Sequence, residues 1–153
     1  MDFGKCMNAA LLPIVAAVIL GIAGTIISNI PVVNFLMCCV GIPMMIVNVA
    51  ILGWAGFNAG KAGQEIVGGV VAGGIAGAVS SMINGIINLV LSTILTVVLV
   101  GGVSAFGASV DIVGVLLNAL LNGIVSIIIG FGFWVVIGLI AGAIGAFAAS
   151  QMK

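Results

Sequence analysis

The chain contains 153 residues, of which 64% are hydrophobic and only 4% are charged, and its formal net charge is zero. A soluble domain carries about a quarter charged residues, so this composition excludes a water-facing surface. The three basic residues, Lys5, Lys61 and Lys153, are too few and too widely spaced to neutralise a phosphate backbone, which excludes nucleic acid as a partner. The composition predicts an integral membrane protein whose main contact is the lipid bilayer.

Two apolar segments come first along the chain, residues 9–30 and 32–57, with Pro31 as the expected turn. Each can cross a bilayer core of about 30 Å at a rise of about 1.5 Å per residue. The first segment exceeds the apolar region of a signal peptide, which spans about 7 to 15 residues, so we expect a retained helix. The polar residues 58–65 are expected to form the next loop.

Two longer apolar segments follow, residues 66–103 and 112–149. As unbroken helices each would measure about 57 Å, and tilts of up to about 40° cannot fit that length into the bilayer core. The helices therefore either continue beyond the membrane or break, most readily at residues 84–85 and 130–132. Each break would be a very tight, uncharged turn.

These segments predict an all-α fold, a polytopic transmembrane helical bundle that forms one membrane domain, residues 1–153. We expect four spans with long or broken third and fourth helices, and the alternative is six segments. With four spans, the N-terminus, the Lys61 loop and the C-terminus share one side of the membrane. Because basic residues favour the inner side, we predict a multi-pass protein of the cell membrane with both termini in the cytoplasm.

Glycines recur every four residues in the third segment and again in the fourth. Small residues at this spacing let helix backbones approach closely, which is how helices associate in lipid. Two interpretations stay open at this point, packing among the chain's own helices and association with a second chain. The residues predicted to pack helices are Gly69, Gly73, Gly77, Gly138 and Gly142.

Polar side chains also recur every four residues, in two sets separated by 34 positions. This spacing places each set on one face of a helix, and polar groups at membrane depth avoid lipid. They are expected to hydrogen-bond across helices or to line a polar cavity. The candidate intramembrane polar stripe comprises Asn84, Asn88 and Ser92, then Asn118, Asn122 and Ser126.

Residues suited to catalysis or metal binding are scarce. The chain has no histidine, and the carboxylates Asp2, Glu65 and Asp111 all fall at the edges of the apolar segments. Neither an acid–base pair nor a metal-ligand set can be assembled from these, so we predict no enzyme activity, no cofactor and no metal site. The three cysteines are expected to be small packing residues, and they are Cys6, Cys38 and Cys39.

In its length, four apolar segments and abundant glycine, the chain resembles the proteolipids that form the rings of rotary ATPases. That family carries an ion-binding carboxylate in mid-membrane, whereas Glu65 and Asp111 lie at segment edges. The chain departs from the family at the residue on which ion transport depends.

A second resemblance is to small, uncharacterised glycine-rich multi-pass membrane proteins of archaea and bacteria. It covers about the first 90 residues, and it implies a prokaryotic membrane protein without supplying a reaction. The stretches that carry it are Asn8-Ala-Ala-Leu-Leu, Ile30-Pro31-Val32-Val33, Trp54-Ala-Gly56-Phe and residues 69–77.

Two functional hypotheses follow from these patterns. The first is a non-enzymatic membrane protein that acts through helix association, as a self-assembling scaffold or as an accessory subunit beside other membrane subunits. Its basis is the glycine spacing and the surplus length of the last two segments. The alternative is an oligomeric pore or facilitator for water or a small neutral solute, because two uncharged polar stripes could face one pathway.

Overall fold

The computed structural model describes residues 2–28, 37–105 and 111–152. Within these ranges the elements are four α-helices, each long and apolar enough to cross a membrane. This confirms the predicted all-α bundle of four spans. The helices are α1 (Phe3–Ser28), α3 (Met37–Lys61), α4 (Ile66–Ala105) and α5 (Ile112–Gln151). The predicted turn at Pro31 lies outside the described residues.

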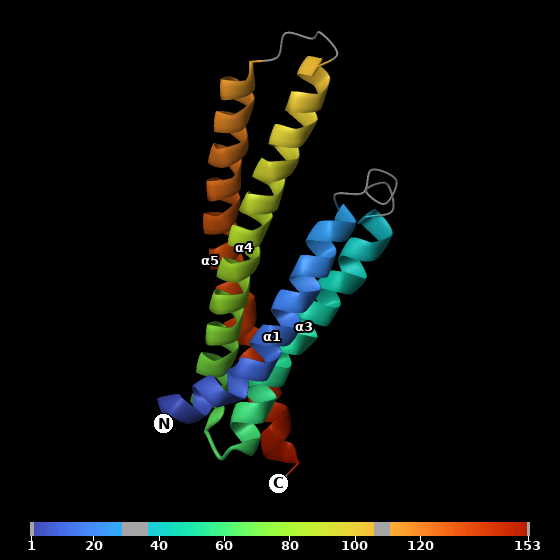
Figure 1. Cartoon of the computed structure of the whole chain (residues 1–153). Coiled ribbons are helices and arrows are strands. Elements are labelled where there is room, and N and C mark those ends of the chain that lie inside the picture. Colours follow the sequence, from blue (N-terminus) through green and yellow to red (C-terminus); the bar gives the residue numbers. More distant parts are fainter. Residues whose placement is uncertain (1, 29–36, 106–110, 153) are drawn as a thin grey trace.

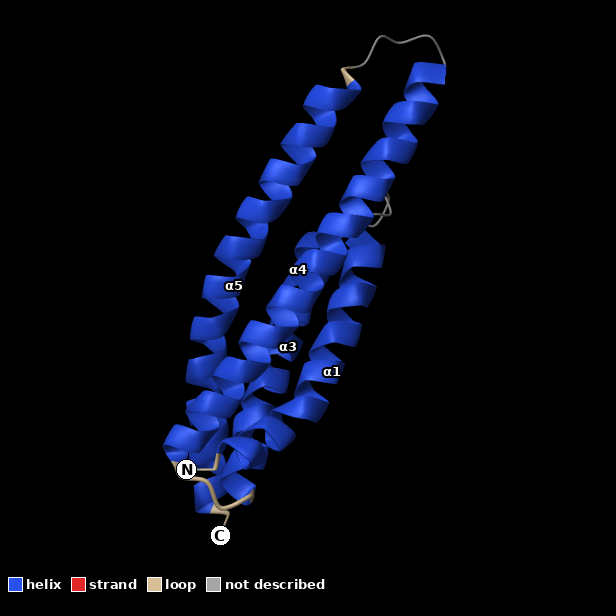
Figure 2. Cartoon of the chain, turned by 60° about the vertical axis from the view of Figure 1, so that its left-hand side comes forward, coloured by secondary structure: helices blue, strands red, loops and turns tan. Residues whose placement is uncertain are grey.

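The four helices meet at one end of the molecule, here called the base, and spread apart toward the other end (Figure 1). Both termini and the turn between α3 and α4 lie at the base, as Figure 2 also shows. The backbone nitrogen of Asp2 donates to Gln64 Oε1 at 3.0 Å, which ties the N-terminus to this turn. The start of α1, which carries Lys5, and the turn between α3 and α4, which follows Lys61, therefore lie at one end of the bundle, as four spans require.

Helices α4 and α5 run without a break, so of the two alternatives left open by the sequence the structure has long helices and neither break. A break would expose backbone groups that an intact helix satisfies internally, and in lipid each such group is costly. Gly85 is instead a packing position, because a Cβ there would lie 2.9 Å from Ile127 on α5. Residues 130–132 continue the helix even though Gly130 and Gly132 have no neighbour within 4 Å of a Cβ.

The ends of the first two helices also differ from the predicted segments. Helix α1 starts at Phe3, six positions before the predicted start, and α3 continues to Lys61 through the first half of the expected loop. The reason for the longer α3 is packing, since Ala59 and Gly60 are buried. A Cβ at Gly60 would lie 2.8 Å from the Ala149 side chain of α5, so this turn of α3 is held against that helix.

The core at the base is built from very small side chains. Two buried clusters occupy it, and alanine is their commonest member. Because alanine and glycine add little bulk between helix axes, the backbones approach closely and pack without large interdigitating side chains. The buried members are Ala10, Leu52, Ala55, Ala76 and Ala141 in one cluster and Cys6, Ala59 and Ala72 in the other.

Candidate functional site: a polar cleft above a glycine-packed base

Directly above this core, the α1–α3 pair separates from the α4–α5 pair and leaves a cleft of about 500 Å³. This volume lies within the range of about 300 to 1,000 Å³ that is typical of small-molecule sites. Leu52, Ser80 and Trp134 line the cleft, and Ser80 and Leu52 are themselves buried. Ala76 and Ala141 are packed into the core on the base side of these residues, so the cleft is closed toward the base.

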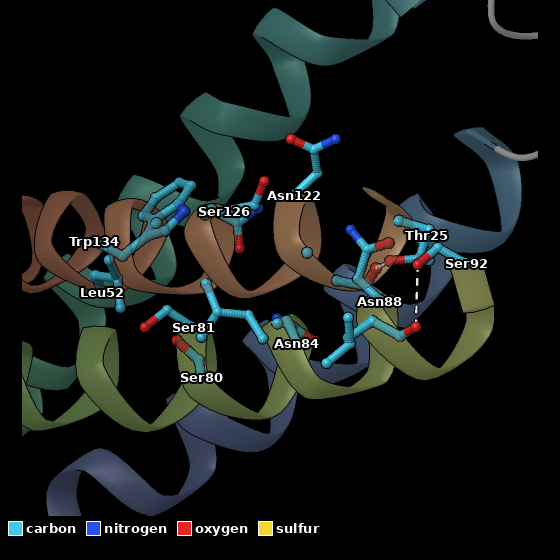
Figure 3. A pocket seen from close by; sticks show the side chains of 18 residues that line it. Thr25, Leu52, Ser80, Ser81, Asn84, Asn88, Ser92, Asn122, Ser126 and Trp134 are labelled. Atoms are coloured by element: carbon cyan, nitrogen blue, oxygen red, sulfur yellow. Dashed lines mark hydrogen bonds between the residues drawn. The ribbon is translucent and has the colours of Figure 1, made fainter. Parts of the chain in front are cut away.

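The cleft is lined by five of the six residues of the candidate polar stripe (Figure 3). Three belong to α4 and two to α5, so the two sets face one common space. None of the lining residues carries a charge. The sixth residue of the stripe, Asn118, is exposed on α5 and does not line the cleft. The five are Asn84, Asn88, Ser92, Asn122 and Ser126.

The α4–α5 packing explains why the two sets converge. Near the base the two backbones are in contact, whereas higher up the side chains of Leu89 and Ile127 separate them. A Cβ at Gly123 would meet Leu89, which shows that α5 leaves room for this leucine. The five lining residues of the stripe lie beside this α4–α5 contact and face the space between the two helix pairs.

Asn84 forms the polar contact between α4 and α1. Its Nδ2 donates to the carbonyl oxygen of Ala17 at 3.3 Å. Gly21 makes this contact possible, because a Cβ at that position would collide with the Asn84 amide. The oxygen of the same amide, Oδ1, is buried and has no hydrogen-bond partner among the described residues. An unpaired buried acceptor costs about 1 to 3 kcal/mol. One hydrogen-bond acceptor on this wall of the cleft is thus left without a donor.

The described hydroxyl groups of α4 bond to carbonyls of their own helix. Ser80 Oγ donates to the carbonyl of Ala76 at 2.6 Å, and Ser92 Oγ donates to that of Leu89 at 3.0 Å. Such bonds let a serine sit at membrane depth without an interhelical partner. Asn88 differs, because its amide is exposed and makes no hydrogen bond within the described part of the chain. Asn88 is therefore the α4 amide most available to an occupant of the cleft.

Several residues of the cleft wall lie outside the candidate polar stripe, and some of them come from other helices than α4. Thr25 comes from α1, Asn48 from α3 and Trp134 from α5. The first two carry a signal of the kind used for the stripes, a polar residue inside an apolar helix. That signal identifies such residues singly, but it gives no indication that they share a space with α4 and α5.

The predicted packing glycines lie in the interior of the helix bundle. Gly69, Gly73 and Gly77 are buried on α4 and face Gly138 and Gly142 of α5. A Cβ at Gly73 would lie 2.7 Å from Gly142 Cα, and a Cβ at Gly142 would lie 2.9 Å from Gly73 Cα. Of the two interpretations left open by the sequence, the structure therefore shows packing among the chain's own helices. The glycines leave no free ridge for a second chain.

The cysteines fall into two groups. Cys6 is buried in the base beside Ala59 and Ala72, where it acts as a small apolar residue. The side chains of Cys38 and Cys39 lie outside the described residues. Among the described residues, no group of three His, Cys, Asp or Glu side chains is placed to hold a metal ion.

Comparison with known proteins finds no matching family model, no similar curated protein and no similar solved structure. Function must therefore be argued from the geometry of the cleft.

Proposed function

We propose that this chain is a non-enzymatic multi-pass membrane protein that admits water or a small uncharged solute into the polar cleft. The observation that carries the proposal is the convergence of five stripe residues on one cavity. Amides and hydroxyls at membrane depth are stabilised when they bond to each other or to a polar occupant. Asn88, Asn122 and Ser126 keep exposed polar atoms in the cleft, so an occupant has partners there.

The absence of charge from the cleft wall supports an uncharged solute. Protons and ions normally need ionisable or charged groups along their route, and none of the lining residues provides one. The cleft is also closed toward the base, so it has the form of a vestibule. Passage to the base side would require the helices packed around Ala76 and Ala141 to separate.

Orientation follows from the basic residues gathered at the base. We assign the base, with both termini, to the cytoplasmic side, because loops rich in lysine stay there. The cleft then lies on the outer side of the glycine-packed core and would receive solute from outside the cell.

The proposal is tested by reconstituting the protein into liposomes and following osmotic volume changes with urea or glycerol as the solute. We expect faster equilibration than in protein-free vesicles. Asn88→Leu should reduce the added rate about fivefold, the equivalent of one hydrogen bond of about 1 kcal/mol. Asn8→Leu is the matched control, because Asn8 is an exposed asparagine on α1 that does not line the cleft.

Two results would contradict the proposal. Wild-type vesicles as tight as protein-free ones would show that the cleft delivers nothing across the membrane. An ion current carried by the wild type would show that the cleft accepts charge, contrary to its uncharged lining.

A second candidate function, a subunit of a homo-oligomeric membrane assembly, is favoured by the far halves of α4 and α5. Each of these helices has 40 residues, or about 60 Å, against about 39 Å for α1. At a tilt of about 40° the longer helices still span about 46 Å, more than a bilayer core of about 30 Å. Their far halves nevertheless expose large apolar side chains, including Val98, Leu117 and Leu121.

A second copy of this chain is the occupant that we assign to this surface. Asn118 and Asn122 are exposed on α5 and bond to each other, with Asn122 Nδ2 donating to Asn118 Oδ1 at 3.0 Å. Amides both donate and accept, so the same pair on a second copy would be complementary. Copies inserted in the same direction present these amides at the same depth. The amides of two copies are then placed to hydrogen-bond to each other, whereas a lipid tail has no hydrogen-bonding group.

Thiol cross-linking tests this second candidate. In a chain whose native cysteines are replaced by alanine, Leu121→Cys should give an oxidised dimer in native membranes. Ile140→Cys is the matched control, because Ile140 is 58% exposed but lies on the base half of α5. Equal dimer yields from both positions, or none from position 121, would show that the far half of α5 is not an interface.

A further inference from the structure

The contact between α4 and α5 changes at the closed end of the cleft. Toward the base, a Cβ at Gly77 would collide with the carbonyl of Trp134, so the two backbones touch. Away from the base, a Cβ at Gly85 would lie 2.9 Å from the side chain of Ile127, so a side chain fills the contact there. Between these two contacts the helices run antiparallel, and each residue along α4 is matched by one residue along α5 (Figure 1).

Two serines of α4 and two glycines of α5 lie at the same level in this stretch. Counting inward from the two contacts places Ser80 and Ser81 beside residues 130–132. Ser80 Oγ donates to the carbonyl of Ala76 at 2.6 Å, and Ser81 Oγ donates to that of Ala78 at 3.0 Å. A serine that bonds to the carbonyl four residues earlier, as Ser80 does, slightly destabilises its helix and often bends it, so α4 is weakened at this level.

The glycines of α5 at this level make no close contact. Nothing lies within 4 Å of a Cβ at Gly130 or Gly132, whereas every other described glycine of α5 has a neighbour within that distance. Relative to alanine, each glycine inside a helix lowers the preference for the helical state about fivefold. Sharp bends in helices occur at pairs of glycine and serine, and here such residues lie side by side on two packed helices.

The surroundings decide the direction in which the helices can bend. On one edge of the cleft, Asn84 bonds to the carbonyl of Ala17 on α1, about one turn beyond the two serines. Because this contact lies close to the weakened level, a bend there moves it little. On the other edge, Asn48 of α3 and Ser126 of α5 line the cleft, and no hydrogen bond joins α3 to α5 in the described part of the chain. The far halves of α4 and α5 can therefore turn toward α3.

We propose that Ser80, Ser81, Gly130 and Gly132 form a hinge at which the far halves of α4 and α5 bend toward α3 and narrow the cleft. The hinge is a property of the two helices, and its use in enclosing a solute rests on the proposed function. Leu117 lies 14 residues, or about 21 Å, beyond the middle of the α5 part of the hinge. A bend of about 20°, the smallest that counts as a sharp kink, would move it by about 7 Å.

Pulsed electron paramagnetic resonance tests the hinge in a chain whose native cysteines are replaced by alanine. Spin labels are attached to Ile46→Cys on α3 and Leu117→Cys on α5, both exposed positions, and the labelled protein is diluted with unlabelled protein in mild detergent. We expect a distribution of distances between the labels that extends about 7 Å below its longest component. Each of Gly130→Ala and Gly132→Ala should reduce the population of the shorter distances about fivefold.

The matched control is Gly41→Ala combined with Gly102→Ala, because a Cβ at either position also meets nothing within 4 Å and both lie near helix ends. This control should leave the distance distribution unchanged. Equal widths in the wild type and in the Gly130→Ala/Gly132→Ala variant would overturn the hinge. If the variant narrowed the distribution while wild-type liposomes stayed as tight as protein-free ones, the hinge would stand and the proposed function would be overturned.

Discussion

The glycine contact between α4 and α5 can be tested with a single methyl group. In Gly73→Ala the new Cβ would collide with the Gly138 carbonyl and lie 2.7 Å from Gly142 Cα. The second distance is about 0.7 Å short of ordinary contact at 3.4 Å. Both obstructing atoms belong to backbone, so no side-chain rotation relieves the overlap and the helices must move apart.

The expected magnitude combines two opposing effects. Overpacking costs about 1 to 3 kcal/mol, and we take the upper end because two backbone atoms are struck. Replacing glycine by alanine in a helix returns about 1 kcal/mol, so the net loss of stability is about 2 kcal/mol. For a chain of this size that corresponds to a fall of about 4 to 8 °C in the unfolding midpoint.

Thermal unfolding in mild detergent, followed by circular dichroism, measures this loss. Gly102→Ala is the matched control on the same helix, because nothing lies within 4 Å of a Cβ at that position. This control should be unchanged or slightly stabilised. If both variants melted at the same temperature, the close approach of α4 and α5 at Gly73 would not be a feature of the folded protein.

Three further perturbations test other parts of the structure. Gly21→Ala should displace the Asn84 amide and break its bond to Ala17, for a loss of about 1 to 2 kcal/mol, whereas Gly41→Ala, with open space around it, should melt like wild type. Asp111→Ala should cost about 1 kcal/mol by removing the acceptor for the Gly114 nitrogen at the start of α5, and Asp111→Asn should retain most of the stability, both judged by thermal unfolding. In a cysteine-free chain, a thiol at Val113 should react with a membrane-impermeant reagent on intact cells while thiols at Ala62 and Gln151 stay protected, and labelling of position 62 or 151 would reverse the assigned orientation.

The membrane character and the number of helices could be predicted because each rests on composition over a long window. A helix of 25 apolar residues gives the same signal whatever it packs against. The glycine spacing also placed Gly73 and Gly142 at close contacts. What the spacing left open was whether the contact is made within one chain, because four-residue periodicity has the same meaning for either partner.

The helix ends and the continuity of α4 and α5 depend on information that local sequence does not carry. Gly85 and Gly130 look alike in sequence, yet a Cβ at the first would meet Ile127 and a Cβ at the second would meet open space. Tertiary packing explains the first case and the cleft explains the second. In the same way, the extension of α3 to Lys61 depends on its contact with α5 rather than on the polar residues that suggested a loop.

The arrangement separates two requirements that a membrane site for a polar solute must meet. Rigidity comes from the base, where Gly73 and Gly142 hold the backbones together and no polar side chain below Ser80 is buried among the described residues. Hydrogen bonding comes from the cleft above it, where Asn88 and Asn122 project from helices that are no longer in backbone contact. Because these amides do not hold the base together, their replacement by leucine should remove solute binding while leaving the unfolding midpoint close to that of wild type. A variant that lost binding and stability together would instead show that the amides bind the helices to each other.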